Sequence, residues 1–250
     1  VSRAGYFRQE LDAQGRQTEY PDTWDPSRWA TRLGAAIAVT IEERQVWVGG
    51  WLYVQQGEGG GRVPVILLDT DLNVNKSADR EITHYLYGGD AVYRLKQEIV
   101  LGMGGVRMLH ALGFKVHKYH MNEGHSALLA LELLHRYSYP PTDLRQGESP
   151  YDLPRVREIC VFTTHTPVEA GHDQFGYDLV QRVLSNPLDP ALLKSLAGTE
   201  ALNMTRLALN LSHYVNGVAV RHAEVSQKLY PGYRVHAVTN GVHPHTWACA

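Results

Sequence analysis

The chain has 250 residues, of which 44% are hydrophobic, and this is enough apolar material for one large domain or two small ones. A formal net charge of −2 favours neither nucleic acid nor an anionic membrane as a partner. No apolar run reaches membrane-spanning length and two cysteines do not make a disulfide framework, so we expect a cytoplasmic protein.

Both ends of the sequence look like cut points. The chain begins at Val1 without an apolar signal region, and it stops directly after a strand-like segment. We therefore expect it to be a fragment of a longer protein.

The first third of the chain is predicted to be rich in turns and strands. Residues 1–33 are polar and contain several prolines and aromatic residues. Residues 36–41 and 45–48 flank a charged turn and are typical of a β-hairpin. Further strands are predicted at 51–54 and 63–68, joined by a glycine-rich loop that lacks the Lys-Ser/Thr pair of a phosphate-binding loop.

From residue 90 onward the pattern alternates between helix and strand. Apolar residues recur at helical spacing from Arg94 to Leu112, and Gly113 is a natural helix end. We expect a helix at 126–135, a helix broken near 216–217 within 204–229, and strands at 114–120, 158–163 and 233–238. Such alternation predicts an α/β fold with a parallel sheet.

Three polar segments follow predicted strands, at residues 121–125, 163–167 and 239–243. In parallel α/β sheets, ligands bind at the carboxyl ends of the strands. Asparagine, carboxylate and histidine side chains suit a polyol, because each sugar hydroxyl both donates and accepts hydrogen bonds. The sequence therefore predicts a polar crevice at this edge of the sheet.

Three other kinds of site are disfavoured by the same sequence. His117 and His120 would face opposite sides of the predicted strand and no cysteine lies near, so we predict no metal site. The glycines at 102–105 lie within a predicted helix, where close packing explains them better than a dinucleotide. A serine nucleophile is also disfavoured, because Ser126 and Ser212 fall inside predicted helices.

Five segments of the sequence resemble the α-glucan phosphorylases, glycosyltransferase family 35, and in particular their shorter bacterial and archaeal branch. The similarity runs from about Gly5 to the end of the chain and is densest after Leu86. The order and spacing of the segments together are specific. They are residues 93–98, 122–126, 163–167, 212–222 and 239–242.

The resemblance implies a GT-B glycosyltransferase, with two Rossmann-like domains and the active site between them. Residues 1–250 would form part of the N-terminal domain, with a turn- and β-rich portion at 1–85 and an alternating α/β portion at 86–250. The implied reaction is phosphorolysis of glycogen or maltodextrin to α-glucose 1-phosphate. The implied cofactor is pyridoxal phosphate, whose lysine belongs to a second domain outside this chain, so the fragment alone is expected to be inactive.

The resemblance also implies roles for individual residues. His222 matches a histidine whose carbonyl and ring meet the glucosyl unit, and Arg94 matches an arginine on the acceptor side. Glu123, where many members have aspartate, and His125 would line the acceptor subsite. Asp90 is a candidate loop carboxylate. The implied partners are the glucan and inorganic phosphate, and the oligomeric state is left open.

Two alternatives stay open from the sequence. The first is a GT-B glucosyltransferase of the glycogen-synthase kind, which uses a nucleotide sugar. The second is a non-catalytic glucan-binding module. The sequence that follows residue 250 would distinguish them, because only a phosphorylase carries a pyridoxal-lysine segment and only the binding module would end there.

Overall fold

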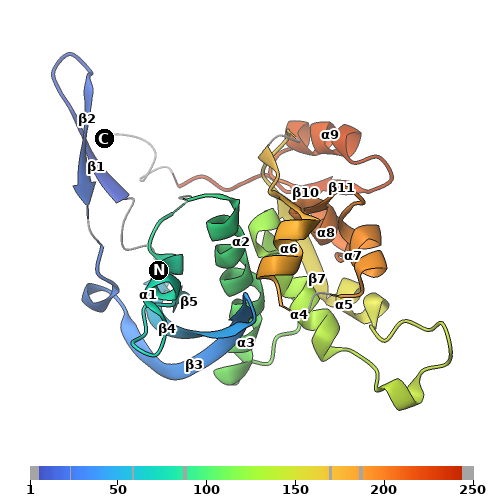
Figure 1. Ribbon diagram of the computed structural model, residues 1–250. Coiled ribbons are helices and arrows are strands. Elements are labelled where there is room, and N and C mark those ends of the chain that lie inside the picture. Colours follow the sequence, from blue (N-terminus) through green and yellow to red (C-terminus); the bar gives the residue numbers. More distant parts are fainter. Residues whose placement is uncertain are drawn as a thin grey trace. The chain divides into compact units, whose positions relative to one another are not determined.

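A computed structural model describes most of the chain (Figure 1). It divides into two compact units, unit 1 with Val1–Lys115 and Tyr177–Pro187, and unit 2 with Val116–Gly176 and Leu188–Ala250. None of the described helices is long and apolar enough to cross a membrane. The described residues are 6–22, 24–57, 59–86, 89–168, 171–185 and 188–243.

Unit 1 is built on an antiparallel sheet of three strands, which confirms the predicted hairpin. These strands are β3 (Thr31–Ile41), β4 (Arg44–Gln56) and β5 (Arg62–Asp69), in that order. The predicted strands at 45–48 and 51–54 are one continuous strand, because β4 stays paired with β5 through Gly49 and Gly50, while its pairing with β3 shifts register there. The inward-facing side chains of Val39, Ile41, Val46 and Val48 are buried.

The hairpin between β3 and β4 turns through Glu42 and Glu43, which both have positive φ, 49° and 62°. Two such residues in a row are typical of the two-residue turn that suits the twist of paired strands. Glutamate is an unusual choice there, and other contacts support it. The Glu42 carboxylate forms ion pairs with Arg44 at 2.6 Å and Lys96 at 2.8 Å.

One long helical segment packs on this sheet, as the apolar spacing predicts. It consists of α2 (Ala91–Ile99), a π-helical stretch (Val100–Gly104) and α3 (Gly105–Ala111). Gly113 has φ of 80°, and the N–H groups of Gly113 and Phe114 donate to His110 and Leu109, which closes the helix in a Schellman motif. The predicted helix end is therefore confirmed.

The other elements of unit 1 surround this core. Helix α6, though distant in sequence, packs on α2, and Leu184 bridges Ile41 of β3. The β1–β2 hairpin is a separate two-stranded sheet whose side chains from 7 to 20 are all exposed. These elements are β1 (Tyr6–Leu11), β2 (Gln17–Asp22), α1 (Ser77–Arg80), α6 (Tyr177–Val183) and the 3-10 turns Pro26–Arg28 and Glu81–Thr83.

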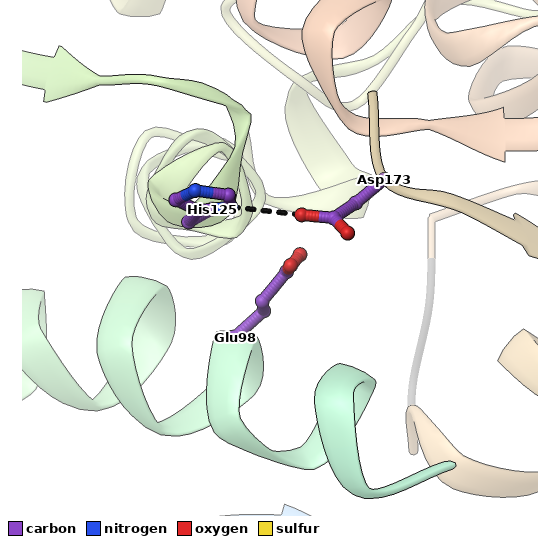
Figure 2. A group of neighbouring side chains, drawn as sticks. All are labelled: Glu98, His125 and Asp173. Atoms are coloured by element: carbon purple, nitrogen blue, oxygen red, sulfur yellow. Dashed lines mark hydrogen bonds and ion pairs between the residues drawn. The ribbon is translucent and has the colours of Figure 1, made fainter. Parts of the chain in front are cut away.

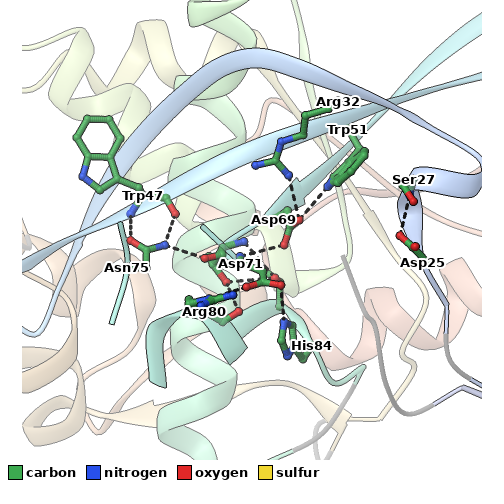
Figure 3. A network of polar contacts seen from close by, with 12 residues as sticks. Asp25, Ser27, Arg32, Trp47, Trp51, Asp69, Asp71, Asn75, Arg80 and His84 are labelled. Carbon is green, nitrogen blue, oxygen red and sulfur yellow. Dashed lines mark hydrogen bonds and ion pairs between the residues drawn. The ribbon is translucent and has the colours of Figure 1, made fainter. Parts of the chain in front are cut away.

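A polar network ties the segment after β5 to the sheet (Figure 3). The buried carboxylate of Asp69 accepts hydrogen bonds from the indole of Trp51 at 2.8 Å and from Arg32 at 3.2 Å. The Asn75 side chain accepts from the N–H of Trp47 and donates to its carbonyl, and Arg80 pairs with Asp71. Because each of these polar groups has a hydrogen-bond partner, the network holds this segment in place with little desolvation cost.

Unit 2 is built on a parallel sheet of four strands in the order β11-β10-β7-β6, which confirms the predicted α/β class. The predicted strand at 158–163 is present as β7 in the middle of the sheet, but it begins only at residue 160, because residues 158 and 159 end a helix. The strands are β6 (Tyr119–Asn122), β7 (Cys160–Thr164), β10 (Tyr214–Gly217) and β11 (Val235–Ala237).

Two sequence predictions in unit 2 are wrong. Residues 114–118 are not a strand, because pairing begins only where Tyr119 meets Cys160 of β7. The break expected near residues 216–217 contains a whole strand, β10. Its four residues lie between two helices, and their place in the sheet is set by pairing with distant strands on both sides, which local spacing does not reveal.

Helices cover the parallel sheet, and the side chains of α4 are almost all buried. Ser212, expected inside a helix, lies in the turn before β10, and Ser126 closes a short 3-10 turn. The remaining elements are α4 (Leu128–Arg136), α5 (Leu153–Ile159), α7 (Pro190–Ala197), α8 (Met204–Asn210), α9 (Val220–Leu229), β8 (Gln174–Gly176), β9 (Ala201–Asn203) and the 3-10 turns Gly124–Ser126 and Pro141–Asp143.

Candidate functional site at the carboxyl ends of the parallel strands

A row of polar side chains crosses the parallel sheet near the carboxyl ends of its strands. His120 of β6 bonds the Thr163 hydroxyl of β7 at 2.6 Å, and that hydroxyl donates to Asn216 Oδ1 of β10 at 2.9 Å. A hydroxyl has one proton, so Thr163 must accept from His120, whose Nε2 therefore carries a proton. This row fixes the lateral positions of three strand ends.

Glu123 joins the end of β6 to the loop that follows β7. Its Oε2 accepts a hydrogen bond from the His165 N–H and another from the Thr166 hydroxyl, both at 2.8 Å. Its own N–H donates to the Thr163 carbonyl at 2.9 Å, which extends the β6–β7 pairing past the last strand residue. The carboxylate thus spans two neighbouring strand ends.

The backbone of Glu123 is strained. Its φ of 66° and ψ of 170° lie in a region that is essentially restricted to glycine. A non-glycine residue in such a conformation costs about 1–3 kcal/mol and is found mostly where function or tight packing requires it. The next residue, Gly124, leaves no room for a side chain, because a Cβ would lie 3.2 Å from Met204 and Thr205 of α8.

His125 is oriented by a carboxylate from a distant part of unit 2 (Figure 2). Its Nδ1 lies 2.8 Å from Oδ2 of Asp173, just before β8. Such a contact fixes the orientation of the imidazole ring. Glu98, drawn in the same figure, belongs to unit 1.

His222 lies in the first turn of α9 and packs against the end of β10. A Cβ at Gly217 would overlap its Nδ1, so glycine is needed there. The only side-chain contact of the ring in the described structure is a long one, 3.4 Å to Ser226. The carbonyl of a residue this early in a helix accepts a hydrogen bond from four residues later, so the ring is the more available group.

Buried polar atoms without partners gather at this edge. Four such atoms occur in the described part of unit 2, and three of them lie where β6, β7 and β10 end. A buried polar atom without a partner normally indicates a water or ligand position. The three are Glu123 Oε1, Thr164 Oγ1 and His222 Nε2, and the fourth is Ser212 Oγ.

Thr164 and His222 share one face of the sheet. Thr164 pairs with Gly217 in register, and paired residues point their side chains to the same side. His222 packs on Gly217, so its ring and the Thr164 hydroxyl lie over adjacent strands. A hydroxyl, an imidazole and a carboxylate together can hydrogen-bond a polyhydroxylated ligand.

The described part of unit 2 places neither a reactive thiol nor a lysine amine at this edge. Burial raises the pKa of the Cys160 thiol to about 12, so the thiol stays protonated. Lysine is also lacking there, because Lys118 precedes β6 and donates to the Glu158 carbonyl. Lys194 and Lys228 lie on α7 and in the last turn of α9. The polar groups at this edge are therefore hydroxyls, imidazoles, an amide and a carboxylate.

The other two predicted site residues belong to unit 1. Arg94 lies on α2, where its Nε is 3.3 Å from Oε1 of the buried Glu98, one helical turn away. Asp90 is the N-cap of α2, and its carboxylate accepts from the Tyr93 N–H at 2.9 Å. Within unit 2, Glu123 and His125 follow the end of β6, and His222 packs on the end of β10, two strands away.

Sequence reasoning missed Asp173, and it did not single out Thr164 and Thr166 within their segment. The two threonines lie in a segment flagged as polar, but nothing local distinguishes their contacts. Asp173 gives no local signal, because its contact with His125 spans 48 residues. Asn216 bonds within the sheet, to Thr163 and to the Gly217 carbonyl.

The fold and this edge define an α/β protein with a polar ligand edge at the ends of a parallel sheet. Its sequence is related to the α-glucan phosphorylases. It is 35% identical to maltodextrin phosphorylase of Thermococcus litoralis, over 97% of this chain and 30% of that protein. It is also 35% identical to glycogen phosphorylase of Mycobacterium tuberculosis, over 98% of this chain and 32% of that one.

A third relative extends this similarity. Glycogen phosphorylase of Aquifex aeolicus is 33% identical, over 99% of this chain and 36% of that protein. The chain therefore spans about a third of the length of these curated relatives. No family model matches the chain.

Proposed function

We propose that this chain is part of an α-1,4-glucan phosphorylase, which cleaves glycogen or maltodextrin with inorganic phosphate and releases α-glucose 1-phosphate. The observation that carries the proposal is the identity of 33–35% with proteins named glycogen or maltodextrin phosphorylase, sustained over 97–99% of the chain. We further infer that residues 1–250 form most of the N-terminal domain of a GT-B enzyme.

The candidate site supports a carbohydrate substrate. We propose His222 of unit 2 as the catalytic residue, and Glu123 and His125 of the same unit as substrate-binding residues. Arg94 and Asp90 of unit 1 are proposed substrate-binding residues as well. We assign the substrate contact of His222 to its ring, because the ring atom Nε2 is buried without a partner while the carbonyl lies inside a helical turn. Asp173 would hold His125 in one orientation for a sugar hydroxyl.

The residues at this edge would act by position and charge. Glycosyl transfer passes through a state with positive charge on the sugar, and a fixed carboxylate or dipole nearby stabilises that charge. Water must also be kept out, because it competes with phosphate for the same carbon.

Pyridoxal phosphate is the proposed cofactor, and its phosphate group would exchange protons with the substrate phosphate. The described lysines of unit 2 lie away from the strand ends, so this edge does not fit the lysine attachment of that cofactor. We place the attachment in the part of the protein that corresponds to the remaining length of the relatives. This chain alone would then be inactive.

The direct test is a product assay on the protein at its natural length. Incubated with maltodextrin and inorganic phosphate, it should form α-glucose 1-phosphate, detected by phosphorus NMR, and omission of phosphate should abolish the product. A parallel incubation with nucleotide-activated glucose tests the glycogen-synthase alternative. Transfer from the nucleotide sugar, or glucan binding without any product, would refute the proposal.

A further inference from the structure

The contacts of Glu123 are directed at the protein itself. One oxygen, Oε2, already accepts two hydrogen bonds, from consecutive residues of the loop that follows β7. Both donors lie within three residues of the last strand residue, Thr164. A carboxylate that accepts from a backbone N–H and a hydroxyl at once fixes the direction in which that loop leaves the sheet.

The backbone of Glu123 supports the same conclusion. Glycine would adopt φ of 66° and ψ of 170° freely, yet the sequence has a glutamate there. Gly124, the very next residue, shows that glycine is used in this segment where space demands it. A strained glutamate is maintained when its side chain does something that glycine cannot do.

We propose that Glu123 is a positioning residue whose Oε2 clamps the loop after β7 at His165 and Thr166. The clamp sets the entrance of the loop beside the Thr164 hydroxyl and the His222 ring. The effect on turnover rests on the proposed phosphorylase function. The clamp itself does not, because it is a property of unit 2.

If the clamp exists, removing its acceptor, Glu123, and removing one of its donors, Thr166, should have the same kind of effect on the loop. In the protein at its natural length, Glu123→Ala removes the acceptor, and Thr166→Val removes one donor while keeping the side-chain shape. Both substitutions should raise the amide hydrogen exchange of His165 and Thr166 at least tenfold. The double variant should exchange no faster than Glu123→Ala, because both changes break one interaction.

Two further variants make this measurement specific. Thr142→Val is the matched control, since the Thr142 hydroxyl is exposed and bonds only its neighbour Asp143 in the described structure. It should leave the exchange of His165 and Thr166 unchanged. Glu123→Gly removes the clamp and the backbone strain together. If the clamp orders the loop, Glu123→Gly exchanges as fast as Glu123→Ala; a protected loop in Glu123→Gly would overturn the proposal.

Kinetics separate positioning from direct contact. If phosphorolysis is observed, Thr166→Val and Glu123→Ala should both lower kcat at least tenfold, with a smaller change in KM for maltodextrin. A rise in KM for Glu123→Ala alone, with Thr166→Val like the unmodified protein, would mean that Glu123 binds substrate and would overturn the positioning role. If no phosphorolysis is seen, the exchange measurement still decides the clamp.

Discussion

At the scale of single residues, Gly217 and His222 compete for the same small space at the end of β10. A Cβ at Gly217 would overlap the imidazole and lie 3.2 Å from the Ala223 nitrogen. Gly217→Ala should therefore destabilise the protein by about 1–3 kcal/mol, as overpacking does. Equilibrium unfolding in guanidinium, followed by circular dichroism, measures the change.

Gly176→Ala is the control for this substitution, because nothing lies within 4 Å of a Cβ at Gly176. Adding His222→Ala to Gly217→Ala should restore only part of the stability, since the Ala223 backbone still crowds the new methyl group. A Gly217→Ala protein as stable as Gly176→Ala would show that the His222 ring is free to move away.

At the scale of elements, the β3–β4 turn depends on the Glu42 carboxylate. Its hydrogen bond with Lys96, and then that with Arg44, lowers the pKa of Glu42 despite partial burial. A carboxylate with a lowered folded pKa contributes stability above its unfolded pKa of about 4.3, and this contribution disappears as pH falls through the folded pKa.

Glu42→Gln should therefore cost about 1 kcal/mol at pH 7, and the difference from the unmodified protein should vanish in acid. Unfolding curves recorded between pH 7 and pH 3 give both quantities. Glu43→Gln is the matched control, because the Glu43 side chain is exposed and its turn contact is made by the backbone N–H to Ser185. A pH-independent loss in Glu42→Gln would exclude the ion pairs as its cause.

Local signals predict the elements that depend on local interactions. The hairpin around Glu42, strand β5 and the helix end at Gly113 all follow from alternation, spacing or a glycine with positive φ. Strand β10 does not follow from them, because its four residues are ordered by partners about 50 residues earlier and 20 later. In such short segments tertiary pairing overrides local preference.

The candidate site divides in the same way. The strand-end positions of Glu123 and His125 are predictable, because polar residues follow an apolar run. Their partners are not, since the contacts with Thr166 and Asp173 span 43 and 48 residues. The sequence thus indicates where the site lies, while the orientation of its side chains depends on long-range contacts.

At the scale of the whole molecule, each of the two units is built from two separate segments of the chain. Unit 1 contains residues 1–115 but also takes residues 177–187 from a later part of the sequence. That later segment is integral to its core: Val180, Val183 and Leu184 are at most 2% exposed. Leu184 bridges Ile41, and the Glu42 N–H donates to the Val183 carbonyl.

Unit 1 should therefore fold only when both of its segments are present. Burial of these three side chains contributes about 5 kcal/mol, a large part of the stability of an ordinary domain. Residues 1–115 alone should unfold without a cooperative transition, whereas residues 1–115 joined to 177–187 by a flexible glycine-serine linker should show one. Tryptophan fluorescence reports this unit well, because four of the five tryptophans lie between residues 24 and 51.

The linked protein with Leu184→Asp separates the packing of this segment from the mere addition of chain. It has the same length, but a carboxylate would enter a position that is 1% exposed, so its cooperative transition should be lost or shifted to much lower denaturant. If residues 1–115 alone unfold as cooperatively as the linked protein, the later segment is dispensable. The later segment would then pack on unit 1 without contributing to its stability.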